Sequence, residues 1–237
     1  GAPAKIAVLK SANPLRLVMA RGYGADIRIA ENGPEGFAIV DRLVKEEGLT
    51  FIHPFDGPNV ARGTGTLGAE IAEDVPALDA VVVAVGGGGL ASGMARAIKL
   101  LQPECEIYGV EPVGAPSMRR SFDEGAPVKL ERIDTIADSL APPMALPYSY
   151  GLARAHMDDI VLVDDDAMCA GLALLQAEAR LAVEPAPAAA IAAAMGPLRE
   201  RVAGKRVCLV ICGANIDAET YGRLLERGRR LRETETS

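Results

Sequence analysis

Short apolar runs alternate along the chain with longer amphipathic stretches. Runs rich in β-branched residues predict strands at residues 5–10, 25–30, 49–53, 79–85, 105–111, 159–164 and 205–212. Apolar residues at helical spacing predict helices at residues 14–22, 34–48, 63–75, 90–101, 165–182, 185–196 and 217–230, and residues 112–150 predict a long irregular section. Buried strands separated by helices are typical of α/β proteins, in which helices cover both faces of parallel twisted sheets.

The same pattern divides the chain into two lobes. Residues 1–56 form a short β-α-β-α-β series, which predicts the remainder of a small α/β lobe. Residues 57–237 hold the other strands and helices and predict a larger α/β domain. A chain of 237 residues is long enough for a large domain with a smaller lobe.

Composition narrows the class of protein. The net charge of −7 argues against a nucleic-acid partner, because such proteins normally carry a basic patch. The cysteines, Cys105, Cys169, Cys208 and Cys212, lack the spacing of a zinc site and predict reduced thiols in a cytoplasmic protein. We find no signal peptide and no apolar run long enough to cross a bilayer, so no membrane association is expected.

Four consecutive glycines stand between a predicted strand and a predicted helix, in the sequence AVGGGGLASGMARAIK at residues 84–99. Glycine-rich loops that open a helix bind anions, because backbone N–H groups and the helix dipole point at the ligand. Two ligand classes fit. A dinucleotide would use the glycines and Glu111, which ends the next strand about 20 residues on. A compact phosphate ester such as pyridoxal phosphate (PLP) would use the loop alone.

Six motifs in series carry a resemblance to a known family. They are HPFDGPNVARGTGTLGAEI, VGGGGLASG, GVEP, TIADSLA, AVEPAPAAAIAA and VICGANID, spread from residue 53 to residue 217. Together they resemble the fold-type II PLP enzymes, which are tryptophan synthase β-like, and within them the serine/threonine dehydratase and serine racemase family. The resemblance covers essentially the whole chain. It implies that residues 57–237 form the PLP-binding domain, incomplete at its N-terminal side.

The resemblance implies roles for individual residues around the cofactor. Cys212 matches the small side chain beside the pyridine nitrogen. Ser139 replaces a glycine that lies against the cofactor ring in the family. The loop that holds the PLP phosphate corresponds to Gly86, Gly87, Gly88, Gly89 and Leu90.

A divalent cation, Mg²⁺ or Ca²⁺, is bound by several members of this family. Glu111 and the backbone of Ala115 match two of the ligand positions, and Ser117 stands where the family has a third ligand, an aspartate. Because hard cations need several oxygen ligands, the loss of that carboxylate weakens the site. The alternative is that Glu111 only caps the following segment or pairs with an arginine.

The resemblance also implies a Schiff-base lysine in a Ser/Phe-Lys-x-Arg-Gly context. No lysine of this sequence has that context; they are Lys5, Lys10, Lys45, Lys99, Lys129 and Lys205. We expect the lysine to lie upstream in a longer parent polypeptide, and we expect the chain as written to be inactive alone. A lysine on a separate chain, and a relative without the lysine that binds PLP without a Schiff base or binds another phosphate, stay open as alternatives.

The activity implied is a PLP-dependent dehydratase, or ammonia-lyase, of β-hydroxy amino acids such as L-threonine or L-serine. Its products are a 2-oxo acid and ammonia. An amino-acid racemase of the same family and a non-catalytic binder of PLP, another phosphate or a dinucleotide stay open as alternatives. The resemblance further implies a homodimer with a small amino acid as its substrate.

Overall fold

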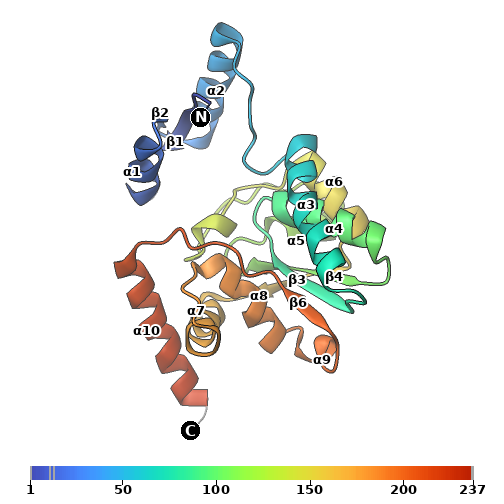
Figure 1. The fold of residues 1–237 in the computed structure, drawn as a ribbon. Helices are drawn as coiled ribbons and strands as arrows, with labels where there is room; N and C mark the ends of the chain where they lie inside the picture. Colours follow the sequence, from blue (N-terminus) through green and yellow to red (C-terminus); the bar gives the residue numbers. More distant parts are fainter. Residues whose placement is uncertain (1, 11, 13, 236–237) are drawn as a thin grey trace. The chain divides into compact units, whose positions relative to one another are not determined.

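The computed structural model describes residues 2–10, 12 and 14–235. The outer ends of the two predicted lobes, at Gly1 and at Thr236 and Ser237, lie outside the described residues, as do Ser11 and Asn13. The chain forms two compact units, Gly1–Ile52 and His53–Ser237 (Figure 1). Both are α/β units with parallel strands, which confirms the predicted fold class. The second unit begins four residues earlier than the predicted boundary at residue 57, because Phe55 and Asp56 bond to Ser149 of this unit.

The first unit is a two-stranded parallel sheet with two helices. Its elements are β1 (Lys5–Leu9), α1 (Pro14–Gly22), β2 (Asp26–Ala30) and α2 (Gly33–Glu47). Asn32 caps α2 by accepting from the Glu35 N–H, and Gly48 ends it in the left-handed conformation. The strand predicted at residues 49–53 is wrong. This segment connects the units and pairs with no strand among the described residues. The side chain of Ile52 is accordingly 74% exposed.

The second unit is built on a four-stranded parallel sheet in the order β5-β4-β3-β6. The strands are β3 (Ala80–Ala84), β4 (Glu106–Pro112), β5 (Asp159–Val163) and β6 (Val207–Leu209). Successive residues of β3 face opposite cores, with Val81 and Val83 in one and Ala80 and Val82 in the other. Both faces of the sheet are therefore covered.

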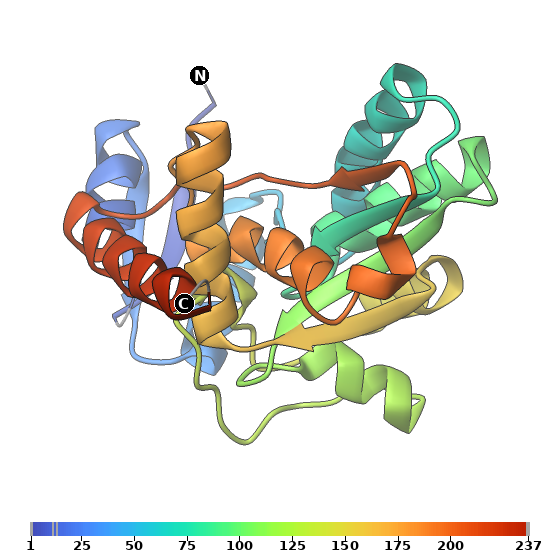
Figure 2. The ribbon, with the colours of Figure 1, turned by 90° about the horizontal axis from the view of Figure 1, so that it is seen from below.

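Helices divide between the two faces of this sheet. One face carries α4 (Gly89–Leu101) and α6 (Pro147–His156), with α3 (Pro58–Asp74) packed on α4. The other carries α8 (Pro185–Met195), and beyond it lie α7 (Asp165–Leu174) and α10 (Ala218–Glu235) (Figures 1 and 2). The Ala-rich sequence of α8 is buried almost throughout, which explains why it is apolar on all sides.

Close packing of α3 and α4 fixes where α4 begins. A Cβ on Gly68 would lie 2.4 Å from the Met94 carbonyl oxygen, so this position tolerates only glycine at the present helix separation. Thr64 Oγ1 on α3 also donates to the Gly89 carbonyl oxygen at 2.8 Å. The start of α4 is thereby held by the neighbouring helix.

Several predicted bounds were wrong. The section predicted as irregular contains α5 (Ser117–Glu124), the 3-10 helix η1 (Asp138–Leu140) and α6, and the short helix α9 (Arg199–Val202) was not predicted. Helix α3 begins at Pro58 rather than at residue 63, and α7 passes into a π-helical turn, η2 (Leu175–Ala179), instead of continuing to residue 182. Among the described residues, no helix has the length and apolar character needed to span a membrane.

Candidate active site

The strand order places the glycine loop at a reversal point of the sheet. Strands β3, β4 and β5 follow one another in one direction, whereas β6 lies on the other side of β3. The segments after β3 and β6 therefore lead to helices on opposite faces, and the carboxyl ends of these strands flank a crevice. Ligands of open parallel sheets bind at such points. Residues 86–89 follow β3, and Cys212 follows β6.

Backbone N–H groups of the glycine loop are free to bind an anion. The N-cap residue of α4, Gly88, has a φ of 84°, in the left-handed region. The Ser92 N–H is the first to bond back, to the Gly88 carbonyl oxygen at 2.8 Å. Within the described residues, the N–H groups of residues 86–91 donate no hydrogen bond to the chain. With the positive end of the α4 dipole, they form a cradle that fits a phosphate group.

Phe55 lies directly against this loop. A Cβ on Gly87 would lie 2.2 Å from the Phe55 ring, and a Cβ on Gly89 would lie 2.6 Å from the Phe55 carbonyl oxygen. Ser149 Oγ donates to that carbonyl oxygen at 2.6 Å, and the Ser149 N–H donates to Asp56 at 2.7 Å. The glycines are therefore required by the chain's own packing as well as by any anion that the loop binds.

The glycine loop opens onto a cavity of about 210 Å³. Pockets for small molecules typically have volumes of roughly 300–1,000 Å³, and this cavity is smaller. A compact phosphate ester therefore suits it better than an extended dinucleotide. All of the residues predicted to surround the cofactor line it, namely Gly86, Gly87, Gly88, Gly89, Leu90, Ser139 and Cys212.

A carboxylate that the sequence analysis did not single out stands on the same cavity wall. Glu184, the N-cap residue of α8, is only 8% exposed and lines the cavity. Ser139 Oγ donates to Glu184 Oε1 at 2.6 Å. Partial burial of the thiol, together with the nearby Glu184 carboxylate, raises the pKa of Cys212. The cavity thus combines an electropositive loop with a negative charge on another wall.

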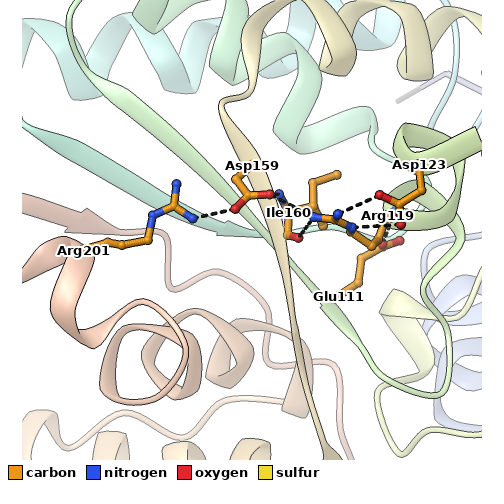
Figure 3. Close-up of polar contacts among 6 residues, drawn as sticks. All are labelled: Glu111, Arg119, Asp123, Asp159, Ile160 and Arg201. Atoms are coloured by element: carbon orange, nitrogen blue, oxygen red, sulfur yellow. Dashed lines mark hydrogen bonds and ion pairs between the residues drawn. The ribbon is translucent and has the colours of Figure 1, made fainter. Parts of the chain in front are cut away.

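Glu111 is fully buried near the end of β4. Its carboxylate accepts from the backbone N–H of Met118 at 2.8 Å, in the first turn of α5. It also accepts from the backbone N–H of Arg119 at 2.7 Å (Figure 3). The Arg119 guanidinium is engaged by Asp123 and Asp159, both within 3.0 Å. Burial raises the pKa of Glu111 to about 8, against the opposing effect of the two backbone hydrogen bonds. Glu111 is therefore a buried cap of α5.

The predicted cation ligands do not fit a divalent ion in this arrangement. Both Glu111 oxygens already accept backbone N–H groups, and the Ala115 carbonyl oxygen accepts from the Ser117 N–H at 3.0 Å. Ser117 offers a hydroxyl, 3.5 Å from Glu111 Oε1, where the family has a carboxylate. Among the described residues, no group of three His, Cys, Asp or Glu side chains is placed to hold a metal. We therefore assign no step to a cation.

The lysines of the second unit lie away from the cavity lining. Lys99 pairs with Asp158 at 2.9 Å. Lys205 pairs with Glu106, at the end of β4 opposite to the crevice. In the first unit, Lys5 pairs with Glu47, and Lys10 pairs with Glu31.

Together, these features define an α/β protein with a phosphate cradle at the carboxyl edge of a parallel sheet. A model of the family described as pyridoxal-phosphate dependent enzyme matches residues 1–213. The chain belongs to this family, which confirms the resemblance drawn from the motifs.

Three known proteins illustrate the relationship. The chain is 48% identical to phenylserine dehydratase of Ralstonia pickettii over 96% of its own length and 70% of that protein. It is 34% identical to L-threonine ammonia-lyase of Thermotoga maritima over 96% of its length, spanning 57% of that relative. The structure of maize serine racemase superimposes with a TM-score of 0.88 at 27% identity, covering 98% of this chain and 72% of that one.

Sequence reasoning missed Phe55 and Glu184. Both stand inside quoted motifs, HPFDGPN and AVEPAP, yet neither spacing nor residue type indicated a place at the site. For Glu184 a signal was present, because a lone carboxylate at the start of an otherwise apolar helix requires a polar partner. For Phe55 the position depends on Ser149, far away in sequence.

Proposed function

We propose that this chain forms part of a PLP-dependent dehydratase that converts β-hydroxy amino acids into 2-oxo acids and ammonia. One observation carries the proposal: the glycine loop presents unpaired N–H groups to the same cavity as Cys212, at the reversal point of the sheet. The printed activity of the relative at 48% identity, phenylserine dehydratase, favours β-elimination from a hydroxy amino acid.

Each residue of the site has a part in this proposal. The N–H groups of residues 86–91 would hold the phosphate of PLP, and Cys212, which lines the same cavity, would serve as the neutral partner of the pyridine nitrogen. Phe55 packs against Gly87 and Gly89 and so holds the shape of the loop. Bound PLP supplies the electron sink that removal of the α-proton requires. This use of PLP agrees with the family match and with the small cavity.

The reaction is tested by product analysis with the protein as purified from its native source. L-threonine, L-serine and phenylserine are supplied separately, and 2-oxo acid and ammonia are measured. Equal amounts of both products support a dehydratase. Formation of D-serine from L-serine without 2-oxo acid would instead identify a racemase, and binding of a dinucleotide without binding of PLP would identify a non-catalytic binder.

A finer part of the proposal concerns the Schiff-base lysine. None of the lysines of these 237 residues carries it, so this chain alone turns over neither L-threonine nor L-serine. Support comes from the lysine side chains of the second unit, none of which lines the cavity. Borohydride reduction followed by peptide mapping tests this point. A phosphopyridoxyl adduct on Lys99, Lys129 or another lysine of this sequence would overturn it.

The oligomeric state and the cellular location of the protein are also proposals. We propose a homodimer in the cytoplasm, with a small amino acid as the partner molecule. The thiols of Cys105, Cys169, Cys208 and Cys212 are free, in agreement with a reducing compartment. Light scattering coupled to size exclusion measures the oligomeric state, and a monomer at working concentration would contradict the dimer.

A further inference from the structure

Ser139 and Glu184 form a polar pair that the proposed reaction does not yet use. Ser139 Oγ donates to Glu184 Oε1 at 2.6 Å, across 45 residues of sequence. Within the described residues, Ser139 is the one side chain that donates to this carboxylate. An 8%-exposed carboxylate with a single donor depends strongly on that donor, because an unpaired buried charge is costly.

The position of the Glu184 side chain is fixed from two further directions. A Cβ on Gly213 would lie 3.0 Å from Glu184 Oε1, so this glycine leaves room for the carboxylate. The Glu184 N–H also donates to the Gly213 carbonyl oxygen at 3.2 Å. Glu184 is also the N-cap residue of α8 and stands at the positive end of that helix dipole.

Cys212 directly precedes Gly213 and lines the same cavity. Glu184 is the ionisable neighbour whose charge acts on this thiol, and it disfavours the thiolate. Cys208, on the preceding strand β6, gives a contrast, because burial alone raises the pKa of its thiol. The carboxylate beside Cys212 is thus a local feature of the cavity wall.

We propose that Ser139 is a positioning residue whose hydroxyl holds the Glu184 carboxylate beside Cys212, where the carboxylate disfavours ionisation of the thiol. This inference deepens the proposed function and rests on it for its meaning, because Cys212 is the residue assigned to the pyridine nitrogen. A serine in place of the glycine found in the resembling family thus acts on the cofactor's electronics through Glu184.

The test measures the pH dependence of iodoacetamide alkylation at Cys212, followed by peptide mapping on the protein without added cofactor. Glu184→Gln removes the charge, and Ser139→Ala removes its donor. Glu184→Gln is expected to move the alkylation midpoint of Cys212 to lower pH, by roughly one pH unit for the loss of one neighbouring charge. Ser139→Ala is expected to move the midpoint in the same direction by less, because the carboxylate keeps its charge but loses the hydroxyl that holds it beside Cys212. Ser139→Thr keeps a hydroxyl and is expected to restore the original midpoint.

Cys208 serves as the internal control within the same samples. Its midpoint stays unchanged in all variants if they are folded, whereas a misfolded variant exposes Cys208 as well as Cys212. Should Ser139→Ala misfold, Ser139→Gly replaces it, because the family has glycine at this position. An unchanged Cys212 midpoint in folded Glu184→Gln and Ser139→Ala would overturn the proposal.

Binding of PLP, followed separately by its absorbance, distinguishes the two levels of inference. If PLP binds and the Cys212 midpoint does not move, the proposed function stands and the role of Ser139 fails. If the midpoint moves and PLP does not bind, the polar pair is established and the proposed function fails.

Discussion

The buried Glu111 carboxyl group predicts that the free energy of unfolding falls as the pH rises. In the folded chain its pKa is raised from 4.5 to about 8, mainly by burial. Between these values the folded state binds more protons at Glu111 than the unfolded state does, so stability falls as pH rises from about 4.5 to about 8 and then levels off. At about 1.4 kcal/mol for each pH unit, the interval corresponds to up to about 5 kcal/mol.

The substitution Glu111→Gln removes this titration while keeping a side chain of the same shape. The amide oxygen can replace only one of the two carboxylate acceptors, so one N–H of Met118 or Arg119 loses its acceptor at every pH. We therefore expect the free energy of unfolding of the variant, relative to that of the wild type, to rise by several kcal/mol between pH 5 and pH 9, within the limit of about 5 kcal/mol. Urea unfolding followed by circular dichroism measures the difference, since the chain has no tryptophan for fluorescence. Glu124→Gln, on the exposed side of α5, is the matched control and should change neither value.

A relative stability of the variant that stays constant or falls between pH 5 and pH 9 would refute this reasoning. A fall would mean that ionisation of Glu111 stabilises the fold. The N–H groups of Met118 and Arg119 would then outweigh the cost of burying the charge. A loss of the wild-type pH dependence on adding Mg²⁺ or Ca²⁺ would point to a cation at Glu111 after all.

Three further predictions follow from the packing. Titration with Mg²⁺ or Ca²⁺ is expected to leave the melting temperature of the protein unchanged. A rise in the melting temperature would support a cation site at Glu111. Gly89→Ala, whose Cβ meets the Phe55 backbone, weakens PLP binding about tenfold or more, whereas Gly151→Ala, with open space, does not. Gly228→Ala places a Cβ 1.9 Å from the Cys169 carbonyl oxygen between α10 and α7, and it lowers the free energy of unfolding by about 1–3 kcal/mol in urea titrations. An unchanged or raised value would show that α10 moves to make room.

The elements around the glycine loop were predictable because local sequence decides them. A β-branched run, a glycine run and a helical apolar stripe each have a distinct period or residue type, and β3 and α4 appear where these patterns predict them. The strand predicted at residues 49–53 has a suitable composition, but a strand needs a neighbour to pair with. Pairing is a tertiary property that a short apolar run does not encode.

Helix α5 was missed for a related reason. Its sequence, SMRRSFDE, is only eight residues long and mostly polar, and Met118 and Phe122 are its only large apolar side chains. The helix is held by contacts at its start, where Glu111 accepts two of its first N–H groups. A carboxylate from a strand thus replaces the local N-cap residue on which sequence reasoning depends. Glu111 therefore matches a cation ligand of the family in sequence, whereas in the structure it caps a helix.

The grouping of the site residues follows from strand order more than from any motif. Cys212 and the glycine loop are more than 120 residues apart, and they meet because β6 pairs with β3 instead of extending the sheet beyond β5. That reversal leaves the positive end of α4 on one wall of the cavity and the Glu184 carboxylate on another. Opposite charges on separate walls orient a ligand that has an anionic group at one end and a hydrogen-bonding ring at the other. A symmetrical phosphate would gain from the first wall alone, so the second wall favours a phosphorylated ring over a free phosphate.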